Sequence, residues 1–172
     1  MSLRSALVDS LGLDRDAFRD RVETVADRYD LPATRRALTE TTPEAFDGPE
    51  VLDDYATLPS HTRALVWRVW LFDTAPLGLT VAGPAYEDTP LVYATRTFRD
   101  LTGYSMAELR GENPRLLQGP ETAAGPVDDL REAISVWTPV TVELRNYRRD
   151  GTPFRNRVSL VPIAGDDGTI RN

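Results

Sequence analysis

Apolar and polar residues alternate along two segments near the end of the chain. This period of two over residues 140–147 and 154–163 predicts two β-strands. The four residues Arg148-Arg149-Asp150-Gly151 lie between them and are typical of a hairpin turn. Shorter apolar runs at 77–82 and 91–94 predict two further strands. An antiparallel sheet is therefore expected in the second half of the chain.

The first part of the chain has helical periodicity instead. Apolar residues recur three and four positions apart, at Leu3, Leu7, Leu11, Phe18, Val22, Val25 and Tyr29. Pro32 marks a break, and a further turn or two of helix is expected over 33–39. Residues 60–73 predict one helix capped by Ser60 and so apolar that most of its sides must be buried.

Helices are also expected between the strands. Residues 95–102 predict a short helix with Phe98 and Leu101 facing inward, and residues 127–137 predict a longer one. Ser105 and Glu108 have the spacing of a capping box. The fold class is thus α+β, an antiparallel sheet with flanking helices. We predict a helical module at 1–58, a connecting helix at 59–74 and the α+β domain at 75–172.

The charge composition narrows the function classes. The chain has 172 residues, 27 of them acidic and 20 basic, with a net charge of −7, and every basic residue is arginine. This acidic balance argues against a nucleic-acid-binding surface. High acidity without lysine is similar to proteins of salt-loving microbes such as halophilic archaea, although a high-GC genome also favours arginine over lysine.

We therefore expect the stability of the fold to depend on salt. Removing salt lengthens the range of repulsion among the excess carboxylates, so the melting temperature should fall as salt is withdrawn. A thermal denaturation series over a wide range of salt concentrations measures this. A melting temperature that stays flat across that range would contradict the halophilic interpretation.

Missing residue types exclude several kinds of site. The chain has no cysteine, and His61 is its single histidine. Disulfides, thiol nucleophiles, Ser-His-Asp triads and cysteine–histidine metal sites are therefore excluded, and we predict neither a catalytic nor a metal site. No apolar run approaches the roughly 20 residues that a membrane-spanning helix needs. With no signal peptide recognised at the N-terminus, we expect a cytoplasmic protein that does not bind membranes.

The two long strands each place one carboxamide among apolar residues. Asn146 continues the face of Val142 and Leu144, while Asn156 shares a face with Phe154 and Val158. A buried amide without a partner costs about 1–3 kcal/mol. The two amides therefore bond to each other, to backbone, or to a ligand. The pattern suits a planar heterocycle with alternating donors and acceptors, and we favour a ligand over structural pairing.

A second unusual segment is Gly111-Glu112-Asn113-Pro114-Arg115-Leu116-Leu117-Gln118-Gly119-Pro120. Asn113 is suited to cap a first helical turn, and Pro114 then takes the first helical position, where no N–H is needed. This string resembles the flavin-binding signature of LOV domains, the blue-light-sensing branch of the PAS fold. The resemblance extends over about residues 77–170.

The resemblance implies an FMN site and gives its residues roles. Asn146 and Asn156 match the asparagines that hold the flavin pyrimidine edge, and Asn113 and Gln118 match contacts to the ring and the ribityl chain. Arg115 and Arg131 match the two arginines that bind the FMN phosphate, which suits the bidentate guanidinium group. The apolar lining is matched by Leu117, Leu130, Leu144, Phe154 and Leu160.

Two departures from the family pattern matter. Pro114 stands where the family has the cysteine that bonds to excited flavin, so no flavin–thiol adduct is expected. The family's last strand, with its signal-relaying glutamine, is not found in the sequence. That departure is expected to open one side of the pocket and to leave a sheet edge unpaired.

The sequence thus predicts an FMN-binding, LOV-like sensory domain that lacks the adduct-forming cysteine. Its expected signal is flavin photoreduction or a change of redox state, and the domain itself is not expected to be an enzyme. The alternative is a ligand-free PAS module for protein interaction or dimerisation. Expected partners are a second copy, bound through the N-terminal helices, and a downstream signalling protein.

Overall fold

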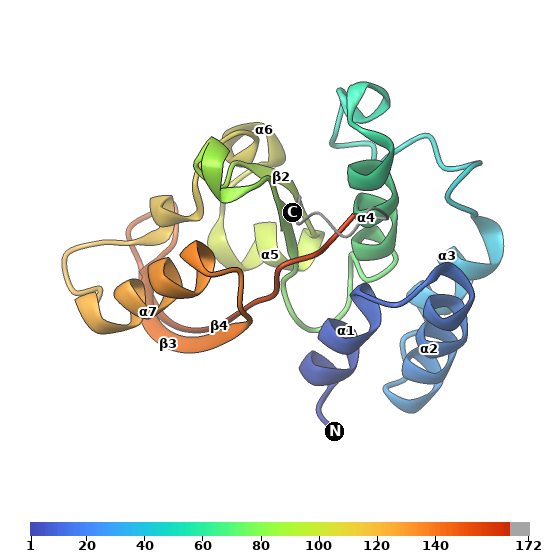
Figure 1. The fold of residues 1–172 in the computed structure, drawn as a ribbon, viewed down its shortest axis with the longest axis horizontal. Coiled ribbons are helices and arrows are strands. Elements are labelled where there is room, and N and C mark those ends of the chain that lie inside the picture. Colours follow the sequence, from blue (N-terminus) through green and yellow to red (C-terminus); the bar gives the residue numbers. More distant parts are fainter. Residues whose placement is uncertain (166–172) are drawn as a thin grey trace. The chain divides into compact units, whose positions relative to one another are not determined.

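The computed structural model describes residues 1–165, which form two compact units (Figure 1). The first unit holds residues 1–81 and 93–98, and the second holds residues 82–92 and the described residues from Arg99 onward. In chain order the elements are α1 (Leu3–Leu11), α2 (Arg15–Arg28), α3 (Pro32–Glu40), η1 (Tyr55–Thr57), α4 (Ser60–Trp70), β1 (Thr80–Ala82), η2 (Ala85–Glu87), β2 (Leu91–Ala94), α5 (Arg96–Thr102), α6 (Met106–Leu109), η3 (Pro114–Leu117), α7 (Ala124–Ser135), β3 (Val140–Tyr147) and β4 (Pro153–Leu160). The predicted α+β class is confirmed, and each unit is described below by itself.

Local sequence signals determine where the first helices begin. The side chain of Asp14 caps α2 by accepting from the backbone N–H of Ala17 at 3.0 Å. Pro32 occupies the first turn of α3, as the predicted break requires. Ser60 is the first residue of α4 rather than its capping residue, because Pro59 precedes the helix and no side-chain cap bond forms. This helix ends at Trp70, three residues before the predicted end.

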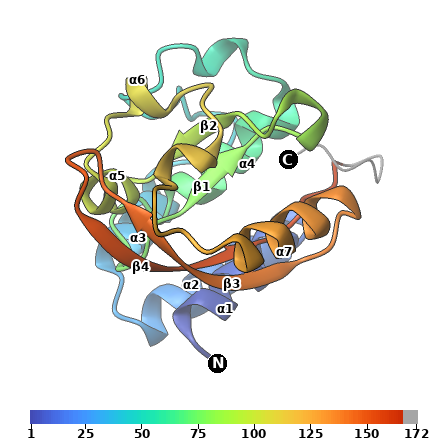
Figure 2. The same cartoon turned by 90° about the vertical axis from the view of Figure 1, so that its left-hand side faces the viewer.

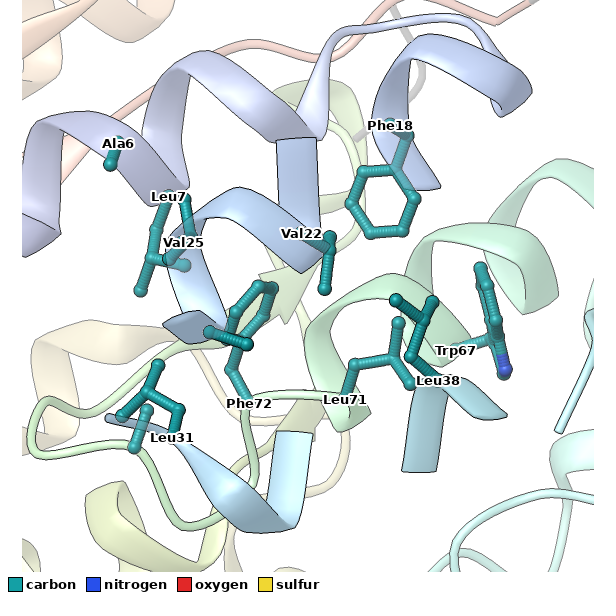
Figure 3. Close-up of a cluster of buried hydrophobic side chains, with 12 residues drawn as sticks. Ala6, Leu7, Phe18, Val22, Val25, Leu31, Leu38, Trp67, Leu71 and Phe72 are labelled. Atoms are coloured by element: carbon teal, nitrogen blue, oxygen red, sulfur yellow. The ribbon is translucent and has the colours of Figure 1, made fainter. Parts of the chain in front are cut away.

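The apolar faces of these helices form one core (Figure 3). Trp67 of α4 and the residues Leu71 and Phe72, which follow that helix, lie in the same cluster as Phe18 and Val22 of α2. The rings of Phe18 and Trp67 have centroids 5.8 Å apart, and the indole N–H donates to Thr41 Oγ1 at 3.1 Å. The helix predicted to be buried on most sides is therefore covered by helices of its own chain.

The turn that follows α4 is bonded to the start of α5 through Asp73. Asp73 accepts from the hydroxyl of Tyr93 at 2.6 Å and from the backbone N–H of Arg96 at 2.8 Å. Tyr93 is fully buried, so its hydroxyl has to find a partner inside the protein. The carboxylate of Asp73 thereby satisfies an N–H at the beginning of α5, where negative charge is favourable.

The second unit is built on the β3–β4 hairpin (Figure 2). The strands pair antiparallel with Val142 opposite Val158 and Leu144 opposite Asn156. Arg148 and Thr152 close the predicted turn by a 2.9 Å backbone bond, and Gly151 adopts φ +85°, which glycine tolerates. Figure 2 shows α7 running along β3, and these two elements are in contact.

Two further predicted details are wrong. The strand predicted at 77–82 is confined to β1, because the N–H of Leu77 bonds back to Ala75 and that of Leu79 bonds to the hydroxyl of Thr95. Leu101 was expected to face inward, but its side chain is exposed at the end of α5. β1 and β2 form one two-stranded sheet, and β3 and β4 form another.

The described residues also bear on two expectations about the whole chain. Among residues 1–165, none of the helices is both long and apolar enough to cross a membrane. The hairpin predicted at 165–168 and the return strand at 169–172 lie, from residue 166 onward, outside the described residues.

Candidate functional site

The two predicted carboxamides meet on one face of the β3–β4 hairpin. Nδ2 of Asn156 donates to Oδ1 of Asn146 at 2.9 Å. Asn146 is only 3% exposed, and its own Nδ2 makes a long 3.4 Å contact with the carbonyl of Arg145. Among the described residues, the oxygen of the Asn156 amide accepts no hydrogen bond. The pair therefore keeps free donor and acceptor capacity beside its mutual bond.

Apolar side chains surround the amide pair, as the alternation predicts. Val142 and Leu144 are buried on the same face of β3, and Phe154 lies directly opposite Asn146. Leu160 on β4 and Leu130 on α7 are half-buried. The opposite face is polar and carries ion pairs, such as Arg155 with Glu143 at 2.5 Å. The hairpin thus has one apolar face that carries two amides and is suited to a ligand, and one polar face that is exposed to solvent.

The predicted turn between two glycines is present as η3. Asn113 Oδ1 accepts from the backbone N–H of Arg115 at 2.8 Å, and Pro114 occupies the first position. Pro114 is exposed and Leu117 is buried. Gly111 adopts φ +81° and its N–H donates to the carbonyl of Leu91, so the turn is attached to the start of β2. The predicted cap is therefore confirmed at the atomic level.

The two candidate phosphate arginines each hold a different carboxylate. Arg115 Nη2 donates to Oδ1 of Asp88 at 2.5 Å, and Arg131 Nη1 donates to Oδ1 of Asp128 at 2.5 Å. The side chains of both pairs are more than half exposed. Such exposed pairs are weak, typically about 0.2–1 kcal/mol, so an anion can displace the carboxylates.

The exit of η3 is fixed to β3 by residues that sequence reasoning missed. The ring of Tyr147 lies so close to Gly119 that a Cβ there would be 2.4 Å from it, so only glycine fits. Tyr147 Oη accepts from the N–H of Glu121 at 3.0 Å, and Thr122 Oγ1 donates to the carbonyl of Arg145 at 2.7 Å. The paired glycines were visible in the sequence, but the tyrosine facing the second was not.

The predicted capping box at α6 is also confirmed, and it reaches the hairpin. Ser105 and Glu108 exchange the two expected bonds, at 2.9 and 3.2 Å. Arg149 from the hairpin turn adds a 2.6 Å bond to the same carboxylate. The Ser105 backbone N–H, with Arg149 as a further cause, lowers the pKa of Glu108 below its ordinary value. The carboxylate thus stays ionised near neutral pH.

The structure links some of the predicted residues by hydrogen bonds and gives others different surroundings. Asn146 and Asn156 share a bond, and Asn113 and Arg115 share Asp88. Arg131 is engaged within its own helix, and Gln118 is exposed just after η3. Asp88 was visible in the sequence only as part of an acidic turn, and nothing there indicated its partners 25 and 27 residues away.

Comparison with known proteins gives the family. A PAS domain model matches residues 78–172. The chain is 34% identical over 168 residues, 97% of its length, to the bacterioopsin transcriptional activator of Halobacterium salinarum, of which it covers 23%. It is 44% identical over 115 residues, 66% of its length, to blue-light-activated histidine kinase 1 of Erythrobacter litoralis, of which it covers 32%.

A solved structure agrees with these sequence matches. The light-oxygen-voltage (LOV) domain studied with a flavin analogue has a TM-score of 0.55 and 36% identity, over 58% of this chain and 74% of that one. The chain spans about a quarter to a third of the two curated relatives named above. The family match covers more than half of the chain. The chain therefore belongs to the PAS domain family, with LOV photosensory domains as its relatives and structural neighbours.

Proposed function

We propose that this protein binds FMN in its second unit and acts as a LOV-like sensory domain without the adduct-forming cysteine. The observation that carries the proposal is the amide pair of Asn146 and Asn156 on an apolar strand face. The flavin pyrimidine edge alternates carbonyl acceptors with an N–H donor. Two carboxamides side by side offer the complementary donors and acceptor.

The residues of the second unit fit this group chemically. Among the described residues, the Asn156 oxygen is available as an acceptor. Asn146 Nδ2 makes only the long contact with the Arg145 carbonyl, which a flavin carbonyl could replace. Leu144 and Phe154 provide apolar surface on the same face for the ring system. Arg115 and Arg131 supply guanidinium groups for a phosphate once their ion pairs with the exposed carboxylates are broken.

A bound flavin would supply blue-light absorption and the capacity to accept an electron. The chain would supply the rest. Asn146 and Asn156 orient the ring edge, and because Asn146 is buried, water is kept from that edge. A changed proton on the ring would change which amide atom donates and which accepts. Such a change in hydrogen bonding can alter how the hairpin packs, and the altered packing would carry the signal beyond the flavin site.

The alternative function, a ligand-free PAS interaction module, is favoured by one observation. The two amides already bond to each other at 2.9 Å, and among the described residues no buried side-chain polar atom lacks a partner. Structural pairing alone would thus satisfy the site. The two functions can be distinguished by measurement, because only flavin binding needs the donor and acceptor atoms that the two amides leave free.

Comparing FMN with riboflavin tests the phosphate part of the proposal. Riboflavin lacks the phosphate, so it should bind more weakly by the loss of two charge-assisted contacts, from Arg115 and Arg131. Titration of the protein with each flavin, followed by flavin fluorescence, gives both dissociation constants. Equal affinities would remove the phosphate role from the two arginines.

We also propose that the protein associates as a homodimer through its N-terminal helices and passes its signal to a downstream protein. Burial of Trp67 within its own chain leaves the outer faces of α1–α3 for such contacts. Light scattering of the full chain should give twice the monomer mass. A single-chain mass across the accessible concentration range would contradict the dimer.

We further expect the protein to act in the cytoplasm.

A further inference from the structure

The turn that follows η2 holds an aspartate in a fixed and unusual conformation. Asp88 adopts φ +66° and Thr89 φ +52°, and neither residue is glycine. The backbone N–H of Asp88 bonds to the carbonyl of Ala85 at 3.0 Å, and that of Thr89 bonds to Pro84 at 3.1 Å. Left-handed residues of this kind are uncommon outside glycine and persist where the surroundings hold them. The backbone therefore sets the direction in which the Asp88 side chain leaves the turn.

This carboxylate meets two of the candidate flavin-contacting residues. Asn113 Nδ2 donates to the backbone carbonyl of Asp88 at 2.7 Å and to its Oδ1 at 3.2 Å. Arg115 Nη2 donates to the same Oδ1 at 2.5 Å. The bond from Asn113 to the backbone does not need the carboxylate, whereas the ion pair with Arg115 does. The charge of Asp88 thus acts on Arg115 more than on the shape of the turn.

We infer that Asp88 determines how strongly this site prefers a phosphorylated flavin over a phosphate-free one. The inference rests on the proposed FMN function. A phosphate held by Arg115 would have to displace the Asp88 carboxylate or lie near it with like charge. Either way the carboxylate lowers the gain from the phosphate, while a flavin without phosphate is unaffected. Asp88 is thus a specificity-determining residue that acts through Arg115.

The substitution Asp88→Asn isolates the charge. Asparagine has nearly the same shape, accepts a hydrogen bond through its Oδ1, and tolerates left-handed backbone well. The bonds of Asn113 to the Asp88 carbonyl and to the N–H of Arg115 should survive. Glu143→Gln is the matched control, because it removes the same charge from another exposed 2.5 Å pair, with Arg155 on the solvated face of the hairpin.

The experiment measures dissociation constants for FMN and riboflavin in the full chain, at the lowest salt concentration at which it is folded. Asp88→Asn should raise the ratio of the riboflavin to the FMN constant by about fivefold, the order expected for one exposed charge a few ångströms away. Riboflavin affinity and the Glu143→Gln ratio should not change. High salt should reduce the effect.

Three results would overturn the inference. An unchanged ratio with both affinities unchanged in Asp88→Asn would show that the carboxylate does not act on the phosphate. Equal weakening of both flavins would make Asp88 a scaffold residue only. If the wild-type chain bound neither flavin, the proposed function would fail and the inference with it, an outcome distinct from flavin binding with an unchanged ratio.

Discussion

Replacing Pro114 with cysteine should introduce a light-induced flavin–thiol adduct that the wild-type chain cannot form. The wild type has no cysteine anywhere, so it has no thiol to bond to flavin. In the LOV family, which the η3 sequence resembles, a cysteine at this position lies beneath the ring and forms that bond. Pro114 is the first residue of η3, where its missing N–H is not needed. Illumination of FMN-loaded Pro114→Cys, followed by absorption, measures the effect.

The turn should tolerate this substitution. The cap from Asn113 goes to the N–H of Arg115, so it does not depend on residue 114. The loss of proline rigidity should lower stability by at most about 1 kcal/mol. Pro114→Ser is the control, since it also removes the proline but adds no thiol, and it should show no thiol-adduct spectrum. If Pro114→Cys binds FMN with an unchanged spectrum and does not bleach, residue 114 does not face the flavin ring.

Removing both amides should weaken flavin binding strongly while leaving the fold stable. In Asn156→Leu alone, the buried Oδ1 of Asn146 loses its donor, at a cost of about 1–3 kcal/mol. Adding Asn146→Leu replaces both partners by apolar groups of similar shape, which is nearly neutral for stability. FMN affinity should nevertheless fall about tenfold or more in the double variant, because the contacts to the pyrimidine edge are lost. Thermal denaturation and FMN titration give the two quantities.

The opposite face of the same hairpin offers a matched control. Thr141 and Ser159 are direct cross-strand neighbours, and their hydroxyls bond at 2.9 Å. The double variant Thr141→Val with Ser159→Ala removes that bond from the polar face and should leave FMN affinity unchanged. Retained FMN affinity in Asn146→Leu with Asn156→Leu would show that the two amides do not hold the flavin. The amides would then be structural only.

The features predicted well from the sequence are those set by neighbours along the chain. The alternation over 140–147 gave the bounds of β3, because one face of that strand is buried and the other is charged. The Asn113 cap and the box of Ser105 and Glu108 need only residues two or three positions apart. Such signals depend on local geometry, which the order of residues specifies directly.

The features missed depend on contacts between distant segments. β1 is short because the side chain of Thr95, 16 residues away, takes the N–H of Leu79. Asp88 could not be assigned to Arg115 before the fold was known, since 27 residues separate them. The amide pair lies between these cases. Strand period placed Asn146 and Asn156 on inward faces, but only the register brought their side chains together.

FMN binding by this protein is tested most simply by an absorption spectrum of the full chain, purified in high salt and titrated with FMN. We expect a yellow protein that holds one flavin per chain, with the structured blue absorption band of a flavin in an ordered, hydrogen-bonded site. Saturating FMN that leaves the protein colourless after removal of free flavin would contradict it. The chain would then be a PAS module in which Asn146 and Asn156 serve only each other.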